Sequence, residues 1–341
     1  TILQTTVLLL TGNFILYLVV QQVVQLLPNI MVSRRADNEF PYLKECHELP
    51  EKEERNGILK NIGAMSMHKL ATVIVNNTDS LLMSSFIGLT AVGIYSNYRM
   101  VIINVQNIIV KLLSAFTGSV GNLSALEEPA KVYRIYREMD FMFFALNAYF
   151  AAGMFILINP FIAIFFGEQY CFSTVTVALI ITSFFITGLR RVNLIFREGM
   201  GLFWNDRYKA VAESIINLVV SLLLVKPFGI AGIVGGTIIS TVTTCAWIEP
   251  YVLMKHGIKE DWQARLRRYF AEYAQHCALT AALSTAGWYA ASRFPIDHIG
   301  KFLAAGVLYT IVFAAVILLC YRKTEEYSSL KARCFALVRR K

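Results

Sequence analysis

Oxygen-bearing side chains interrupt the most apolar stretches of this sequence. Asp79 lies in VIVNNTDSLLMSSFIG, residues 73–88, whose flanks are as apolar as a membrane span. A lone carboxylate in hydrocarbon costs about 2.5–3.5 kcal/mol, so it predicts either a charged partner or a function. Later apolar stretches add four more oxygen donors: Glu213, Asn217, Thr237 and Thr241. Oxygen ligands suit hard cations such as Na⁺, and a carboxylate can also take a proton.

Counting along the expected helices brings polar side chains to a shared depth. At a rise of about 1.5 Å per residue, four of them lie roughly 12–14 Å from the nearest loop on the same side: Asp79, Arg99, Asn217 and Thr237. Glu213 and Thr241 lie one turn deeper, on the same helix faces as the last two. Two interpretations stay open. One is an ion pair between Asp79 and Arg99 with interhelical hydrogen bonds around it, and the other is a site for a monovalent cation or a proton.

Basic side chains also lie inside apolar segments. Lys69 is nine residues from Lys60, and Lys111 is ten residues before Gly121, so each could extend to the membrane interface. Together with Arg99 they could instead line a water-filled cavity with positive charge, which would suit an anionic substrate such as a phosphate or pyrophosphate. Four further charged residues lie near helix ends, where we expect ordinary interfacial placement: Arg190, Arg191, Arg197 and Glu249.

Apolar helices are the elements that would hold these residues. Hydrophobic residues make up 56% of the chain and charged residues only 16%, whereas a soluble domain carries about 25% charged residues. Apolar runs of about 18 residues or more recur along the chain and predict an all-α polytopic membrane protein. We expect about nine transmembrane helices, at 11–33, 60–88, 91–122, 136–166, 172–201, 205–226, 229–255, 268–292 and 299–321.

Lys and Arg are concentrated in alternate loops. Three of them lie on one side, Lys226, Arg293 and Lys301, while 26 lie on the other, in 33–60, 123–137, 188–209, 255–268 and after 321. This asymmetry predicts that the basic loops and the C-terminus are cytoplasmic. The net charge of +9 then reflects topology and contact with anionic lipid, which argues against a nucleic-acid partner.

Two long stretches resemble a known family. Residues 60–100, KNIGAMSMHKLATVIVNNTDSLLMSSFIGLTAVGIYSNYRM, and residues 216–240, INLVVSLLLVKPFGIAGIVGGTIIS, resemble the C-terminal lobe of bacterial polysaccharide flippases. These are the O-antigen and capsule repeat-unit exporters of the multidrug/oligosaccharidyl-lipid/polysaccharide superfamily. FPYL, residues 40–43, resembles the linker between their lobes.

The resemblance implies the C-terminal part of a two-lobe, 14-helix transporter fold. The chain begins without Met, part-way through an apolar run, so we expect a longer protein with about five more helices before it. On this template the chain has five parts: the end of the N-terminal lobe with its last helix (1–33), a cytoplasmic linker (34–59), a six-helix C-terminal lobe (60–255), two additional transmembrane helices (256–321) and a basic cytoplasmic tail (322–341).

In function, the resemblance implies export of an undecaprenyl-pyrophosphate-linked oligosaccharide from the inner to the outer leaflet of the bacterial cytoplasmic membrane, by alternating access. Polysaccharide polymerase machinery is a potential partner. Related peptidoglycan-precursor flippases place a Na⁺ site on the first, fifth and sixth helices of the second lobe. Those helices here carry Asp79, then Glu213 and Asn217, then Thr237 and Thr241, as candidates for Na⁺ or H⁺ coupling. Candidates for the substrate pyrophosphate are the cavity residues Lys69, Arg99 and Lys111.

Other classes of protein fit the sequence less well. A drug or cation antiporter of the same superfamily would more naturally have an acidic or aromatic cavity. A membrane-embedded polymerase or ligase would need a sizeable outer loop, but the longest one expected, 292–300, has nine residues. The sequence has no Ser-His-Asp pattern, no paired Cys or metal spacing and no phosphate-binding P-loop, so it predicts a transporter rather than an enzyme, with no cofactor beyond a coupling ion.

Overall fold

The computed structural model describes residues 2–42 and 51–339, and every regular element in these ranges is a helix. The chain forms two compact units, Thr1–Leu59 and Lys60–Lys341. The first contains α1 (Ile2–Thr11), α2 (Phe14–Glu39) and the first turns of α4 (Lys52–Phe86). Asn13 caps α2, because its side-chain oxygen accepts hydrogen bonds from the backbone N–H groups of Ile15 and Leu16.

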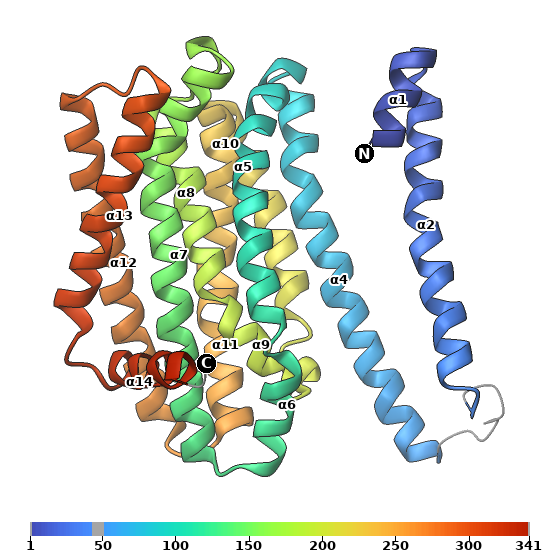
Figure 1. Ribbon diagram of the computed structural model, residues 1–341. Helices are drawn as coiled ribbons and strands as arrows, with labels where there is room; N and C mark the ends of the chain where they lie inside the picture. The colour runs from blue at the N-terminus through green and yellow to red at the C-terminus, as the bar shows by residue number, and fades with distance from the viewer. Residues whose placement is uncertain (1, 43–50, 340–341) are drawn as a thin grey trace. The chain divides into compact units, whose positions relative to one another are not determined.

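The second unit is a helical bundle built around α7 (Figure 1). Its core includes the fully buried aromatic side chains of Tyr98, Tyr136, Phe144 and Phe196. After α4 its helices are α5 (Leu89–Ser114), α6 (Thr117–Leu126), α7 (Pro129–Phe165), α8 (Thr174–Leu189), α9 (Arg191–Gly199), α10 (Lys209–Ser240), α11 (Ala246–Val252), α12 (Trp262–Arg293), α13 (Ile299–Tyr321) and α14 (Glu325–Arg339).

Several helices are long and apolar enough to cross a membrane. On α13 the side chains of Leu303, Val307 and Ile311 recur every four residues and are exposed, which forms a stripe suited to lipid contact. The chain is therefore an all-helical protein of polytopic membrane character. Within the described ranges six stretches meet the length and composition of a span: Phe14–Glu39, Leu89–Leu126, Pro129–Phe165, Thr174–Gly199, Lys209–Ile258 and Ile299–Tyr321.

The longest of these stretches, Lys209–Ile258, is a helical hairpin. The chain reverses at Gly229, where φ is +57°, a conformation that favours glycine. The first arm (209–226) and the second arm (230–258) run antiparallel, since the Ser221 hydroxyl donates to the Ile233 carbonyl at 3.2 Å. These arms are the helices expected at 205–226 and 229–255, although the first begins at Lys209.

Other helix bounds differ from those expected from the sequence. The expected helix 91–122 is two helices, α5 and α6, and 172–201 is divided into α8 and α9 at Arg190. α7 begins at Pro129 rather than 136, because proline at the first helical position loses no hydrogen bond. α4 and α12 also begin earlier than expected, at Lys52 and Trp262. The predicted linker 34–59 is helical at both ends, because α2 continues to Glu39 and α4 begins at Lys52, and residues 43–50 lie outside the described ranges.

Two features were not predicted at all. The second arm contains π-helical turns at Thr241–Cys245 and Leu253–Ile258, and such turns occur often at functional sites. The expected basic tail, 322–341, contains the fifteen-residue helix α14. Residues 340 and 341 of the tail lie outside the described ranges.

Candidate functional site

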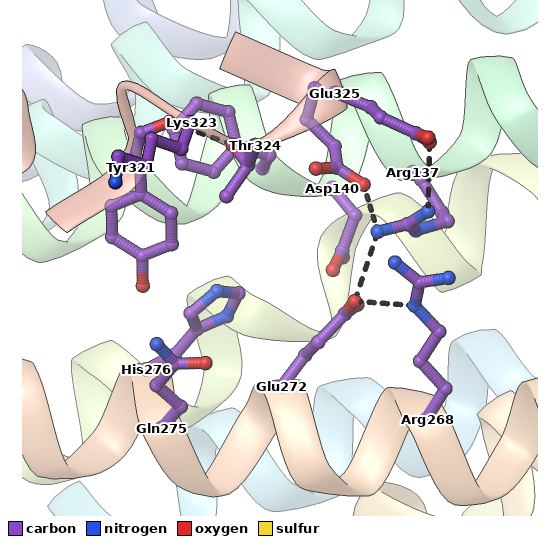
Figure 2. A pocket seen from close by; sticks show the side chains of 12 residues that line it. Arg137, Asp140, Arg268, Glu272, Gln275, His276, Tyr321, Lys323, Thr324 and Glu325 are labelled. Carbon is purple, nitrogen blue, oxygen red and sulfur yellow. Dashed lines mark hydrogen bonds and ion pairs between the residues drawn. The ribbon is translucent and has the colours of Figure 1, made fainter.

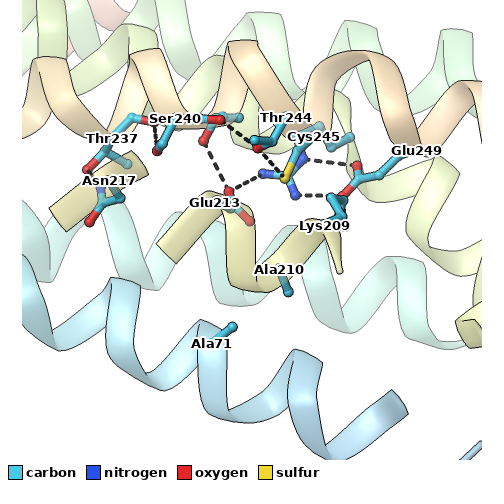
Figure 3. Close-up of polar contacts among 12 residues, drawn as sticks. Ala71, Lys209, Ala210, Glu213, Asn217, Thr237, Ser240, Thr244, Cys245 and Glu249 are labelled. Atoms are coloured by element: carbon cyan, nitrogen blue, oxygen red, sulfur yellow. Dashed lines mark hydrogen bonds and ion pairs between the residues drawn. The ribbon is translucent and has the colours of Figure 1, made fainter. Parts of the chain in front are cut away.

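Asp79 faces the hairpin, as the depth estimate predicts. The Thr237 hydroxyl on the second arm lies 3.4 and 3.5 Å from the two carboxylate oxygens of Asp79. From the first arm, the Asn217 amide nitrogen donates to the Thr237 oxygen at 2.9 Å. The side chains of Asp79, Asn217 and Thr237, which we call the Asp79 layer, therefore converge from three helical segments. Figure 3 shows Asn217 and Thr237 facing one another across the hairpin.

One oxygen of the Asp79 layer is left unsatisfied. Asn217 is completely buried, and its amide oxygen has no hydrogen-bond partner among the described residues. A buried acceptor left unpaired costs about 1–3 kcal/mol. The layer therefore offers a carboxylate, a hydroxyl and an unpaired amide oxygen, which are the ligand types that a hard cation prefers.

An apolar plug closes the Asp79 layer toward the Gly229 turn. Leu82 and Met83 follow Asp79 on α4, while Val225 and Ile233 flank the turn on the two arms, and all four are buried in one hydrophobic cluster. These buried side chains lie between the layer and the turn, whereas Asp79 itself is partly exposed.

Arg99 lies beside the Asp79 layer without replacing its hydrogen bonds. Its guanidinium donates to the Ser80 hydroxyl at 3.1 Å and attracts the Asp79 carboxylate electrostatically. Tyr95, one turn earlier on α5, lies close enough to interact with both charges. Asp79 therefore has a positive neighbour on α5 and a hydroxyl donor on the hairpin.

Glu213 belongs to a different network. Its carboxylate accepts from the Thr241 hydroxyl and from the Arg190 guanidinium, both at 3.3 Å. Arg190 also binds Glu249 through two hydrogen bonds, of 3.0 and 2.6 Å. Glu213 and Thr241 are thus neighbours, as their spacing predicts, but the charge that Glu213 meets is that of Arg190.

This network continues to the end of the hairpin. The Lys209 ammonium lies 2.5 Å from the Glu249 carboxylate and 3.5 Å from that of Asp206, which also binds Arg197 at 2.5 Å. Three acids and three bases alternate, so their charges cancel. We call these residues the six-charge network: Arg190, Arg197, Asp206, Lys209, Glu213 and Glu249. Figure 3 shows three of its members, Lys209, Glu213 and Glu249.

The six-charge network corrects one expectation from the sequence. Arg190, Arg197 and Glu249 are buried and paired rather than simply interfacial, and Glu249 is only 1% exposed. The signal was present in the hairpin register, because Lys209 and Glu249 lie at nearly equal distances from the turn at Gly229. It was missed because each charge, taken alone, fits ordinary placement near a helix end.

The candidate cavity residues have different surroundings. Lys69 on α4 and Lys111 on α5 have exposed side chains, whereas Arg99 is half-buried beside Asp79. Arg99 therefore lies at the candidate ion site, while the two lysines lie on the surface of the second unit.

Comparisons with protein-family models, curated proteins and solved structures gave no match for this chain. Among the described residues, no group of three His, Cys, Asp or Glu could hold a metal ion. A cation at Asp79 would instead be held by one carboxylate with amide and hydroxyl oxygens.

Proposed function

We propose that this chain is the C-terminal part of a polysaccharide flippase. Its substrate is an undecaprenyl-pyrophosphate-linked oligosaccharide, moved from the inner to the outer leaflet of the bacterial cytoplasmic membrane by alternating access. In this proposal the protein has two lobes and 14 helices, of which this chain supplies nine spans, with the basic loops and the C-terminus cytoplasmic. The resemblance of residues 60–100 and 216–240 supports the substrate class.

The observation that carries the coupling part of the proposal is the convergence of Asp79, Thr237 and Asn217. A Na⁺ ion or a proton at Asp79 neutralises its charge, and Na⁺ also uses the unpaired Asn217 oxygen. With the ion bound, α4 is held to the hairpin. Without it, the carboxylate is drawn toward Arg99 on α5.

The coupling ion therefore binds the two helix arrangements with different affinity, which is what a ligand needs in order to shift a conformational equilibrium. The pyrophosphate is attracted by Lys69, Arg99 and Lys111, and binding it near Arg99 weakens the hold of Arg99 on Asp79.

Transport by the full-length protein in proteoliposomes tests the proposal. The vesicles contain lipid-pyrophosphate oligosaccharide, and translocation is followed under an imposed Na⁺ or H⁺ gradient. We expect gradient-driven translocation by the wild type and loss of the gradient dependence in Asp79→Asn. Glu168→Gln is the matched control, because it removes an exposed carboxylate and should leave transport unchanged.

The possible outcomes test the ion site and the substrate class separately. Unchanged coupling in Asp79→Asn would refute the ion site while leaving the substrate open. Absence of lipid translocation, with uptake of a cationic dye in exchange for Na⁺ or H⁺, would refute the substrate class and support a cation antiporter of the same superfamily.

A further inference from the structure

The junction between α13 and α14 forms a fixed corner at one end of the second unit. The backbone N–H of Arg322 donates to the Leu318 carbonyl at 3.0 Å, which completes the last turn of α13. Thr324 then begins α14, since its hydroxyl accepts from the backbone N–H of Tyr327 at 3.4 Å. From this corner α14 runs across the bundle rather than along it (Figure 1).

One face of α14 is bound to α7 by buried charges. Glu326 pairs with Arg137, and the Ser329 hydroxyl donates to the buried carboxylate of Glu138 at 2.7 Å. Arg137 in turn binds Glu272 of α12 at 3.1 Å, and Figure 2 shows this arginine between Glu272 and the start of α14. Glu326 and Ser329 are three residues apart and share a face, so these contacts fix the direction of the opposite face.

The opposite face of α14 borders a cavity of about 510 Å³. Tyr327, Ser328 and Lys331 line it from α14, spaced so that they share one side of the helix. Arg322 lines it from the corner, and Leu318 and Leu319 line it from the last turn of α13. The cavity thus combines two cationic side chains and two hydroxyls with an apolar wall.

The apolar wall is open to the membrane. Leu318 is 47% exposed and Leu319 is 66% exposed, and they continue the exposed apolar surface of α13. A soluble anion would make no apolar contact with these leucines. A lipid offers an anionic head group to the cations and a hydrocarbon chain to the leucines.

We propose that this corner binds the phosphate of an anionic phospholipid. Arg322 and Lys331 bind the phosphate oxygens, and Tyr327 offers a hydroxyl donor, whereas the Ser328 hydroxyl donates to the Thr324 carbonyl. The first carbons of an acyl chain lie along Leu318 and Leu319. The site lies outside the Asp79 layer, and the proposal does not depend on the transported substrate. Its partner is a lipid that surrounds the protein, held where α13 leaves the membrane.

Lipid binding by the purified full-length protein tests this site. The protein in a neutral detergent is titrated with phosphatidylglycerol or with phosphatidylcholine, and bound lipids are counted by native mass spectrometry. We expect phosphatidylglycerol to bind more tightly. Arg322→Gln should weaken that preference about fivefold, and the double variant Arg322→Gln/Lys331→Gln about 30-fold, from the typical contribution of a basic residue near an anionic lipid surface.

Lys323→Gln provides the matched control. It removes the same charge one position from Arg322, but its side chain lines a separate cavity with Arg137 and Glu272 (Figure 2). We expect less than a twofold change for this variant, and Arg322→Lys should keep most of the affinity. Equal losses in Lys323→Gln and Arg322→Gln would mean attraction by overall charge and would overturn the proposal.

Inorganic phosphate and glycerol phosphate separate a lipid site from an anion site. Neither should displace phosphatidylglycerol at millimolar concentration, because neither contacts the leucine wall. Displacement would show a site for free phosphate and would refute the lipid assignment. So would equal binding of phosphatidylcholine, or unchanged affinity in a double variant whose circular dichroism and elution volume match the wild type.

Discussion

The two polar layers of the hairpin differ in how completely their atoms are paired. In the six-charge network every carboxylate meets a cation, and several contacts are 2.5–3.0 Å long. In the Asp79 layer the contacts to the carboxylate are 3.4 and 3.5 Å, and the Asn217 oxygen has no partner among the described residues. The six-charge network leaves the Nε donor of Arg197 without a partner among the described residues, but its paired charges hold the structure rigid. The unpaired atom of the Asp79 layer is an acceptor, which a cation can use.

This difference assigns separate roles to acidic residues on neighbouring helices. Glu249 neutralises two buried bases, so its charge is part of the fold. Asp79 is attracted by one half-buried guanidinium and a distant hydroxyl, so its charge can be taken up by a mobile ion. Stability should therefore depend on the first carboxylate, and transport on the second.

Removing each carboxylate in turn should have the largest effect on stability. Glu249→Gln removes the closest anion of two buried bases and leaves Arg190 and Lys209 only their longer contacts, to Glu213 and Asp206. The loss should lower the free energy of unfolding by about 3–5 kcal/mol. Asp79→Asn removes a partly exposed charge with long contacts and should change the free energy of unfolding by less than about 1 kcal/mol. Thermal unfolding in detergent measures both. Glu198→Gln, an exposed carboxylate close to Arg197, serves as control with an expected change below about 0.5 kcal/mol.

Equal destabilisation in Asp79→Asn and Glu249→Gln would contradict the division of roles. It would make Asp79 one more structural ion pair, with Arg99 as its partner.

Two neighbouring glycines test whether both layers depend on close contact between the arms of the hairpin. A side chain at Gly236 would collide with Ser221 on the first arm, whereas one at Gly235 would meet only a leucine methyl carbon at 3.9 Å. Gly236→Ala should therefore lower the free energy of unfolding by about 1–3 kcal/mol. Gly235→Ala should be neutral or raise it by up to about 1 kcal/mol, because alanine favours helix. Chemical denaturation compares the two variants, and an equal effect of both would mean that the arms separate easily.

Much of the Asp79 layer could be predicted from the sequence because it depends on regular geometry. A constant rise per residue places Asp79, Asn217 and Thr237 at one depth once the turn at Gly229 is recognised. The six-charge network could not be predicted in the same way. It needs the break between α8 and α9 at Arg190 and the turn that holds Asp206, and neither follows from helical periodicity.

The helix α14 was missed for a related reason. Its charges are typical of a solvated tail. The tertiary contacts of Glu326 with Arg137 and of Ser329 with Glu138, and the packing of Tyr327 and Leu330 against the core, show why it is ordered. Local sequence patterns record the periodicity of a helix, but not the distant partner that stabilises it.

The smallest effect on stability, and the sharpest test of the comparison, comes from two threonines one turn apart. Thr237→Val and Thr241→Val each remove one hydroxyl from the second arm, and each should change the free energy of unfolding by only about 0.5–1.5 kcal/mol. Only Thr237→Val should change the ion dependence of transport, because only Thr237 contacts Asp79.

The sign of that change identifies the coupling ion. Na⁺ loses an oxygen ligand in Thr237→Val, so half-maximal transport should need about tenfold more Na⁺, which corresponds to about 1.4 kcal/mol. Proton binding should become stronger instead, because the Asp79 carboxylate loses the donor that stabilises its charged form. Half-maximal transport should then occur at higher pH. Proteoliposome assays across Na⁺ concentration and pH measure both. The same shift in Thr241→Val would mean that the two layers act as one site.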